Sequence, residues 1–90
     1  MIRKHWKFYG DVQGVGFRYR ASHAAEQLGI TGWVKNCWDG SVEMETEGSE
    51  EAMDRLIEII RSSRSIEITR METELIPVCG SKMFTIKRGY

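Results

Sequence analysis

Residues 41–47 alternate strictly between two kinds of side chain. The positions that suit a protein core are Val42, Met44 and Thr46, and the acidic positions between them are Glu43, Glu45 and Glu47. Side chains two residues apart lie on the same face of a strand, so the pattern predicts a strand with one buried and one solvated face. Such a strand is typical of an antiparallel sheet that is covered on one side.

Two other segments have the period of an amphipathic helix. The first starts at residue 17, carries an apolar stripe, and is followed by Gly29, a natural residue to end a helix. The second follows Ser49, a good N-cap, and has acidic residues near its positive end. The two stripes consist of Phe17, Ala21, Ala24, Ala25 and Leu28, and of Met53, Leu56, Ile57 and Ile60. Both stripes need one sheet face to bury them, which places the two helices on the same side.

Four further segments complete the expected order of elements. Strands are predicted over residues 2–12, 30–36, 66–73 and 83–87, the third with a break in alternation near Thr69 and Arg70. Asp39-Gly40 predicts the hairpin that joins the second strand to the third. The order β-α-β-β-α-β plus a short C-terminal strand predicts an α+β, ferredoxin-like two-layer sandwich with a mostly antiparallel sheet. A different two-layer α+β arrangement is the alternative.

Length and charge limit the classes of function. Ninety residues suffice for one core, so residues 1–90 are expected to form a single domain. The formal net charge is zero, from 13 Lys and Arg against 13 Asp and Glu, so nothing steers the whole molecule to nucleic acid or to an acidic membrane. The first twenty residues are basic and residues 39–58 are acidic, which we interpret as two solvated faces of opposite sign.

The two cysteines, Cys37 and Cys79, bear on the compartment. No apolar run is long enough for a signal-peptide core or a membrane span, so a cytoplasmic protein with reduced thiols is expected. A disulfide between the two stays open, because spacing alone does not decide it. Neither cysteine has a nearby histidine in the sequence, and no metal site is expected.

The segment GDVQGVGFR, residues 10–18, joins the first predicted strand to the first predicted helix. Gly14 and Gly16 allow backbone N–H groups to converge on one anion, and a helix N-terminus adds partial positive charge. Arg18 adds a full charge with a planar pair of donors. The segment therefore predicts a site that handles an oxyanion, although the glycines alone would also suit a tight turn.

Two patterns in the chain resemble the signatures of the acylphosphatase family. GDVQGVGFRYR at residues 10–20 is similar to the first, and GWVKN at residues 32–36, followed by DGSVE and EG, is similar to the second. The resemblance covers most of the chain, and two motifs at this spacing are far more specific than one glycine loop.

The resemblance implies hydrolysis of acyl phosphates to a carboxylate and inorganic phosphate, with neither metal nor cofactor. By the same resemblance, Arg18 binds the phosphate and Asn36 positions the attacking water. The loop amides that would wrap the phosphate belong to Gln13, Gly14, Val15, Gly16, Phe17 and Arg18. A carboxylate leaving group, with a pKa of about 4 to 5, needs no general acid, which explains why the motifs contain no catalytic His, Asp, Ser or Cys.

The expected partner is therefore a small acyl phosphate, and inorganic phosphate or sulfate is an expected occupant of the same site. We expect a monomer that binds neither nucleic acid nor membrane. Gln13 is interpreted first as a structural residue, and Trp38 in the hairpin turn as a core-distant aromatic that could flank the site.

Two alternatives stay open on the sequence. The same fold could serve as a non-catalytic module that binds phosphate or carbamoyl phosphate, although a chain with no appended domain favours the free enzyme. A ferredoxin-like sheet could also bind single-stranded RNA through its open face, but the glutamates there and the zero net charge oppose this.

Overall fold

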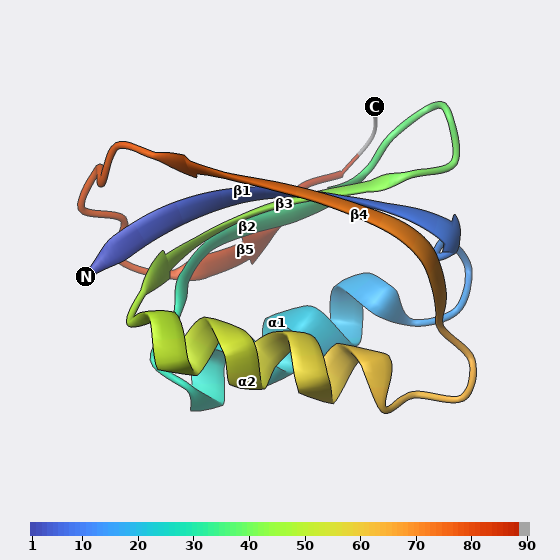
Figure 1. Cartoon of the computed structure of the whole chain (residues 1–90), viewed down its shortest axis with the longest axis horizontal. Helices are drawn as coiled ribbons and strands as arrows, with labels where there is room; N and C mark the ends of the chain where they lie inside the picture. The colour runs from blue at the N-terminus through green and yellow to red at the C-terminus, as the bar shows by residue number, and fades with distance from the viewer. Residues whose placement is uncertain (89–90) are drawn as a thin grey trace.

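The computed structural model describes residues 1–88, so the last two residues of the predicted domain lie outside the described part. The elements in chain order are β1 (Ile2–Asp11), α1 (Phe17–Gln27), β2 (Thr31–Asn36), β3 (Val42–Gly48), α2 (Glu50–Arg61), β4 (Glu67–Ile76) and β5 (Phe84–Ile86). Figure 1 shows two layers, with α1 and α2 packed side by side beneath the sheet. This confirms the predicted α+β sandwich, its order of elements and the placement of both helices on one face.

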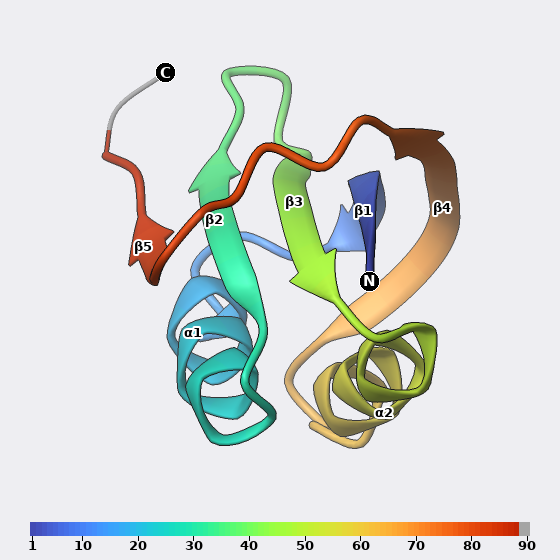
Figure 2. The same cartoon turned by 90° about the vertical axis from the view of Figure 1, so that its left-hand side faces the viewer.

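The sheet of the described residues has the strand order β4-β1-β3-β2-β5. The pairs of β1 with β3, β1 with β4 and β2 with β3 are antiparallel, whereas β5 runs parallel to β2. The two edge strands are therefore β4 and β5, and the segment that joins them must cross the whole sheet. Figure 2 shows residues 77–83 crossing over β3 and β2 on the way to β5.

The core lies between the helices and the inner face of the sheet. Trp6 and Phe8 of β1 stack with ring centroids 6.1 Å apart, and Phe8 meets Phe17 of α1 at 4.9 Å. The Trp6 indole N–H donates to the Thr46 hydroxyl at 2.9 Å, so the buried ring has its polar partner. Fully buried side chains on the other elements include Val34, Met44, Met53, Leu56 and Ile60.

The residues predicted to end α1 and to begin α2 do so in the structure. Gly29 follows α1 with φ of 71°, the left-handed conformation that lets the chain leave a helix. Ser49 is the N-cap of α2, and its hydroxyl accepts a hydrogen bond from the Ala52 N–H at 3.1 Å.

The predicted break in the fourth strand is a register shift. Tyr9 lies opposite Arg70 and Gly10 opposite Ile68, so Thr69 is skipped in the pairing of β4 with β1. A Cβ on Gly10 would lie 2.3 Å from the Glu67 carbonyl oxygen, which explains the glycine at this bulge. The strand is longer than predicted, ending at Ile76 instead of residue 73, because its pairing with β1 continues to Arg3.

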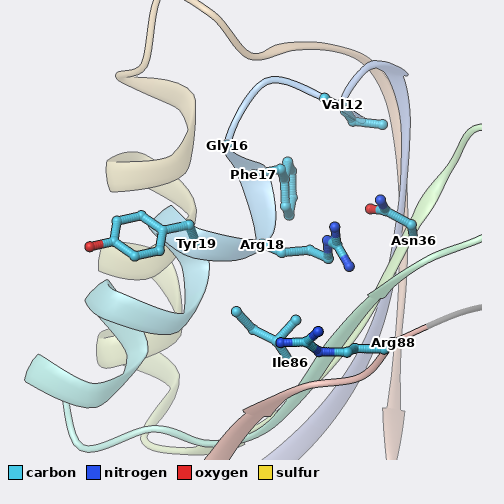
Figure 3. Close-up of a pocket in the computed structure, with 9 residues that line it drawn as sticks. Val12, Gly16, Phe17, Arg18, Tyr19, Asn36, Ile86 and Arg88 are labelled. Atoms are coloured by element: carbon cyan, nitrogen blue, oxygen red, sulfur yellow. The ribbon is translucent and has the colours of Figure 1, made fainter.

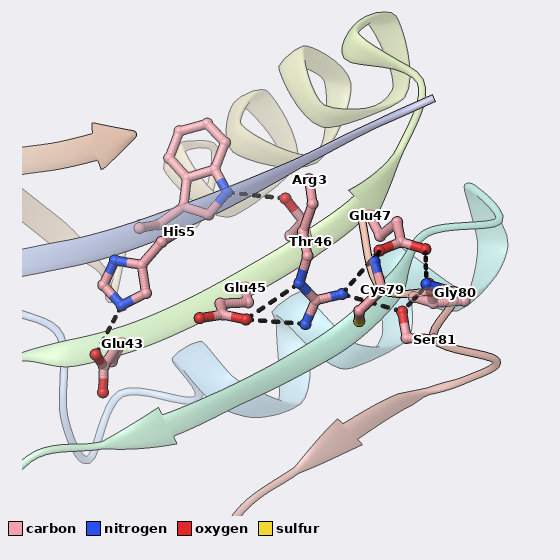
Figure 4. Close-up of polar contacts among 11 residues, drawn as sticks. Arg3, His5, Glu43, Glu45, Thr46, Glu47, Cys79, Gly80 and Ser81 are labelled. Carbon is pink, nitrogen blue, oxygen red and sulfur yellow. Dashed lines mark hydrogen bonds and ion pairs between the residues drawn. The ribbon is translucent and has the colours of Figure 1, made fainter. Parts of the chain in front are cut away.

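The prediction that the glutamates of β3 lie on a solvated face is wrong for Glu47. Glu47 is 2% exposed and Arg3 5% exposed, whereas Glu43 and Glu45 are half-buried. The Arg3 guanidinium donates to Glu45 at 2.9 Å and to Glu47 at 3.1 Å, and His5 contacts Glu43 at 2.7 Å (Figure 4). The crossing segment covers Glu47, since the N–H groups of Cys79 and Gly80 donate to its carboxylate.

In β1 and β3, the basic and acidic residues that were predicted to form two separate faces lie on one face and are paired. In the antiparallel register of β1 and β3, Arg3 lies opposite Glu47, His5 opposite Glu45 and Lys7 opposite Glu43. Lys7 forms a longer ion pair with Asp39, at 3.6 Å. In these two strands, the basic and acidic runs of the sequence therefore reflect the pairing of β1 with β3.

Candidate active site

The glycine loop leads from β1 into α1 and needs glycine for its backbone conformation. Gly14 has φ of 73° and Gly16 has φ of 82°, both in the left-handed region. A Cβ on either residue would meet no atom within 4 Å, so it is the backbone angle, not crowding, that favours glycine. Side chains at these positions would instead occupy the open space in front of the loop.

The N-terminus of α1 is left open by its own sequence. Among the described residues, no side chain caps this helix at Gly16, and its first turn contains no acidic residue. The N–H groups of residues 14–18 make no backbone hydrogen bond within residues 1–88, and the first bond of the helix is from Arg20 N–H to the Gly16 carbonyl at 3.0 Å. Open donors and the helix dipole both favour an anion at this point.

A cavity of about 580 Å³ lies in front of the loop. The structure brings Arg18 and Asn36 together in its wall, one from the first turn of α1 and the other from the last residue of β2. Figure 3 shows the Arg18 guanidinium and the Asn36 amide directed toward one another across this cavity. The lining residues are Val12, Gly14, Gly16, Phe17, Arg18, Tyr19, Asn36, Ile86 and Arg88.

The side chains of the other two predicted loop residues, Gln13 and Val15, do not line the cavity. The Gln13 side-chain amide donates to the carbonyls of Cys37 and Ser41, at 2.7 and 2.8 Å. This ties the loop to the hairpin that follows Asn36, so Gln13 fixes the position of the loop relative to Asn36. Val15 is half-buried and packs against the core.

The hairpin between β2 and β3 is closed by its own hydrogen bonds and exposed at its tip. Hydrogen bonds from the Ser41 hydroxyl and N–H to Asp39 hold the pKa of the Asp39 carboxyl below its usual value. Trp38 is 85% exposed and does not line the cavity in front of the loop. It lines a second, smaller cavity that shares Asn36 with the first.

Sequence reasoning did not identify four residues that line the main cavity, Val12, Tyr19, Ile86 and Arg88. Tyr19 is one residue past Arg18, and its place in the first turn of α1 was the available signal. Ile86 and Arg88 come from the end of the chain, and the sequence does not show that β5 runs beside β2. The parallel register, with Ile86 opposite Val34, brings this segment to the end of β2 where Asn36 lies.

Residues 1–88 contain neither a cluster of metal ligands nor a membrane-spanning helix. No group of three or more His, Cys, Asp or Glu side chains lies close enough to hold a metal ion. Neither helix in this range has the length and apolar character needed to cross a membrane. Cys37 is half-buried and Cys79 exposed, and both are free thiols.

Comparison with known proteins places the chain in a family. The acylphosphatase family model matches residues 4–86. An acylphosphatase of Yersinia pseudotuberculosis is 47% identical over 81 residues, which are 88% of each chain. The crystal structure of acylphosphatase from Bacillus subtilis superposes with a TM-score of 0.90 at 33% identity, over 98% of this chain and 100% of that one.

A further match is to part of a much larger protein. The crystal structure of HypF from T. kodakarensis matches 99% of this chain but 12% of its own length, with a TM-score of 0.83 and 32% identity. The family model, the relatives and the folds agree over nearly the whole described chain. The chain therefore belongs to the acylphosphatase family, whose activity is the hydrolysis of acyl phosphates to a carboxylate and inorganic phosphate.

Proposed function

We propose that this chain hydrolyses acyl phosphates by in-line attack of water on phosphorus, with neither metal nor cofactor. The N–H groups of the loop, Gln13 to Arg18, and the Arg18 guanidinium hold the phosphoryl group, and the Asn36 side chain orients the water. The observation that carries this proposal is that Arg18 and Asn36 line one cavity together with Gly14 and Gly16.

For this reaction, the protein has to position the water and the phosphoryl group and to stabilise the charge on the phosphoryl oxygens. Water oxygen forms the new bond to phosphorus, and the bond from phosphorus to the acyl oxygen breaks. The carboxylate leaves with the electron pair and needs no proton, because its conjugate acid has a pKa of about 4 to 5. The donors around the phosphoryl oxygens stabilise the charge that they carry in the transition state.

Asn36 acts as an orienting group in this mechanism. A side-chain amide is no base at neutral pH, but its oxygen accepts a hydrogen bond from water and its NH₂ donates one. It thereby holds the water in line with the bond that breaks. The proton lost by water passes to an oxygen of the substrate's own phosphoryl group.

The proposed setting is a monomer in the cytoplasm, with residues 1–90 acting as one domain. Balanced charge and two free thiols support it. Inorganic phosphate is the reaction product and, like sulfate, is expected to occupy the loop.

Release of phosphate from benzoyl phosphate in the presence of EDTA tests the proposal. Asn36→Ala is expected to lower kcat by about 10²-fold while leaving the inhibition constant of inorganic phosphate within about twofold, because the variant keeps every phosphate donor. Lys35→Ala is the matched control, since Lys35 precedes Asn36 on β2 and lines the smaller cavity but not the main one. Equal loss in both variants, or an unchanged kcat in Asn36→Ala, would contradict the role of Asn36.

The match to 12% of the length of HypF is an instance of this fold as one part of a larger protein. The second candidate is therefore the alternative left open by the sequence, a non-catalytic module that binds phosphate or carbamoyl phosphate. Calorimetry separates the two. Binding of inorganic phosphate without hydrolysis of any acyl phosphate would favour the module, whereas turnover favours the enzyme.

A further inference from the structure

The main cavity contains a second arginine that the mechanism does not use. Arg88 follows β5, which pairs with β2 so that Ile86 lies opposite Val34. Because side chains alternate along a strand, Ile86 shares the face of Val34 and Asn36. Arg88 lies two residues past the end of β5 and lines the same cavity as Ile86 and Asn36. Figure 3 shows the Arg88 side chain extending beside Ile86 into the space below Arg18.

Neither cavity arginine is paired with a carboxylate of residues 1–88. The ion pairs of these residues join Arg3, Lys4, His5, Lys7, Lys35, Arg55 and Arg70 to acidic partners. Two guanidinium groups therefore face one cavity of about 580 Å³. Like charges that share a cavity are unfavourable until anions enter, so the cavity favours ligands with more than one anionic group.

The donors divide between two walls. The glycine loop, the N-terminus of α1 and Arg18 come from one side and already supply the groups that a phosphoryl needs. The walls that neither the loop nor Asn36 supplies are formed by Tyr19, Ile86 and Arg88. A cavity of this size falls in the range of roughly 300–1,000 Å³ that holds ligands much larger than phosphate. The acyl group of the substrate is what remains to fill it.

We propose that Arg88 is a specificity-determining residue, which selects acyl phosphates whose acyl portion carries a second anionic group such as a carboxylate. This inference rests on the proposed function. The guanidinium binds the distal anion across the cavity, and Ile86, which lies beside Arg88, contacts the carbon chain between the two anions.

Rigid aromatic substrates test this proposal, because their charge can be changed while their shape stays the same. The probes are 3- and 4-carboxybenzoyl phosphate, each compared with the carbamoylbenzoyl phosphate of the same geometry, which differs in charge. For Arg88→Gln, kcat/KM is expected to fall about 3- to 10-fold for at least one carboxy substrate and to stay within about twofold for both carbamoyl substrates. The effect is modest because Arg88 is exposed, and it should shrink at high ionic strength.

Three controls make the result specific. Arg64→Gln makes the same change of net charge on an exposed arginine that lines neither the main cavity nor the smaller one, and it should leave all four rates unchanged. Arg88→Lys should recover part of the preference. Inhibition by inorganic phosphate should not change in Arg88→Gln, because the loop and Arg18 hold that ion.

The outcomes separate this inference from the proposed function. Equal losses on carboxy and carbamoyl substrates would mean that Arg88 holds the phosphoryl group, and equal rates in wild type and Arg88→Gln would remove it from the site. Either result overturns the specificity role while hydrolysis persists. Absence of hydrolysis of all four substrates by the wild type would instead overturn the proposed function.

Discussion

Two regions of this molecule combine an arginine with main-chain N–H groups around the position of an anion. On the outer face of the sheet, Glu47 accepts from the Arg3 guanidinium at 3.1 Å and from the N–H groups of Cys79 and Gly80 at 2.9 and 3.0 Å. At the other region, Arg18 and the N–H groups of the glycine loop surround a cavity with no carboxylate of residues 1–88 among its lining residues. The donors are of the same kind, but one set is filled by the protein itself.

The difference shows how the same interaction serves stability in one place and binding in the other. Glu47 is 2% exposed, so its donors are satisfied and out of reach of any ligand. The donors of the loop are held in position by left-handed glycines and by the start of α1, without a partner of their own. Preformed but unsatisfied donors cost stability, and they bind an external anion for the same reason. The two regions should therefore respond in opposite ways to removal of their arginine.

The largest expected effect is on activity, from Arg18→Gln. Loss of the guanidinium from the open region should lower kcat/KM for benzoyl phosphate by about 10³-fold or more, because the charge on the phosphoryl oxygens loses its cationic partner. The free energy of unfolding should stay the same or rise by a few tenths of a kcal/mol, since a cation leaves a helix N-terminus. Kinetics and urea unfolding of the same preparation measure both.

Arg20→Gln is the matched control on the same helix. Arg20 donates to the Ile59 carbonyl at 3.2 Å and lies outside the main cavity. This variant should retain nearly full activity. Full activity in Arg18→Gln would show that Arg18 has no part in the mechanism, and would contradict the contrast between the two arginines.

The next effect is on stability, from Arg3→Met. Removal of the Arg3 guanidinium leaves Glu45 and Glu47 close together without their shared cation. The expected cost is about 3 kcal/mol, the low end of the range for a buried charge left without its partner. Urea unfolding at neutral pH should show this loss, while activity per folded molecule stays unchanged because the cluster is on the opposite face from the helices. Lys4→Met, whose ion pair with Glu50 is exposed and 3.4 Å long, should cost no more than about 0.5 kcal/mol. Equal costs in the two variants would refute the distinction between filled cluster and surface pair.

The sequence sufficed for the elements because each one depends on local signals. The stripe that begins at Phe17 and the Ser49 cap are properties of short windows, and both helices followed them. The joint position of Arg18 and Asn36 was predictable because two motifs of a known family carry them, and the structure brings both into one cavity.

The rest depended on contacts between distant segments, which no local pattern reveals. The burial of Glu47 results from a crossing segment that must connect two opposite edges of the sheet. Arg88 reaches the cavity only because β5 pairs with β2 in parallel, and the strand predicted over residues 83–87 carries no signal of which strand it pairs with. Alternating glutamates predict a solvated face until the strand order is known.

A smaller and pH-dependent effect is expected from Glu47→Gln. Hydrogen bonds from the Cys79 N–H, and then from Arg3 and the Gly80 N–H, hold the pKa of the Glu47 carboxyl below its ordinary value of 4.5. A lowered folded-state pKa means that this carboxylate stabilises the fold above about pH 4.5, and that the contribution is lost as the pH falls through the folded-state value. The difference in unfolding free energy between wild type and variant should therefore be largest near pH 7 and shrink toward pH 3. A difference that does not depend on pH would assign the role of Glu47 to its shape.

The smallest stability effect should come from giving the open region a carboxylate of its own. Tyr19 is 71% exposed in the first turn of α1 and lines the cavity. Relative to Tyr19→Gln, which loses the same stacking on His23, Tyr19→Glu should stabilise the fold by about 0.3–1 kcal/mol, because an acid near a helix N-terminus complements the dipole. The same carboxylate should raise KM for benzoyl phosphate and weaken inhibition by phosphate, since it repels the anion that the loop binds. With these results, the open region would hold a carboxylate of the protein, as the region around Glu47 does. A Tyr19→Glu variant that gains stability with unchanged phosphate inhibition would instead show that the helix N-terminus and the anion site are separate.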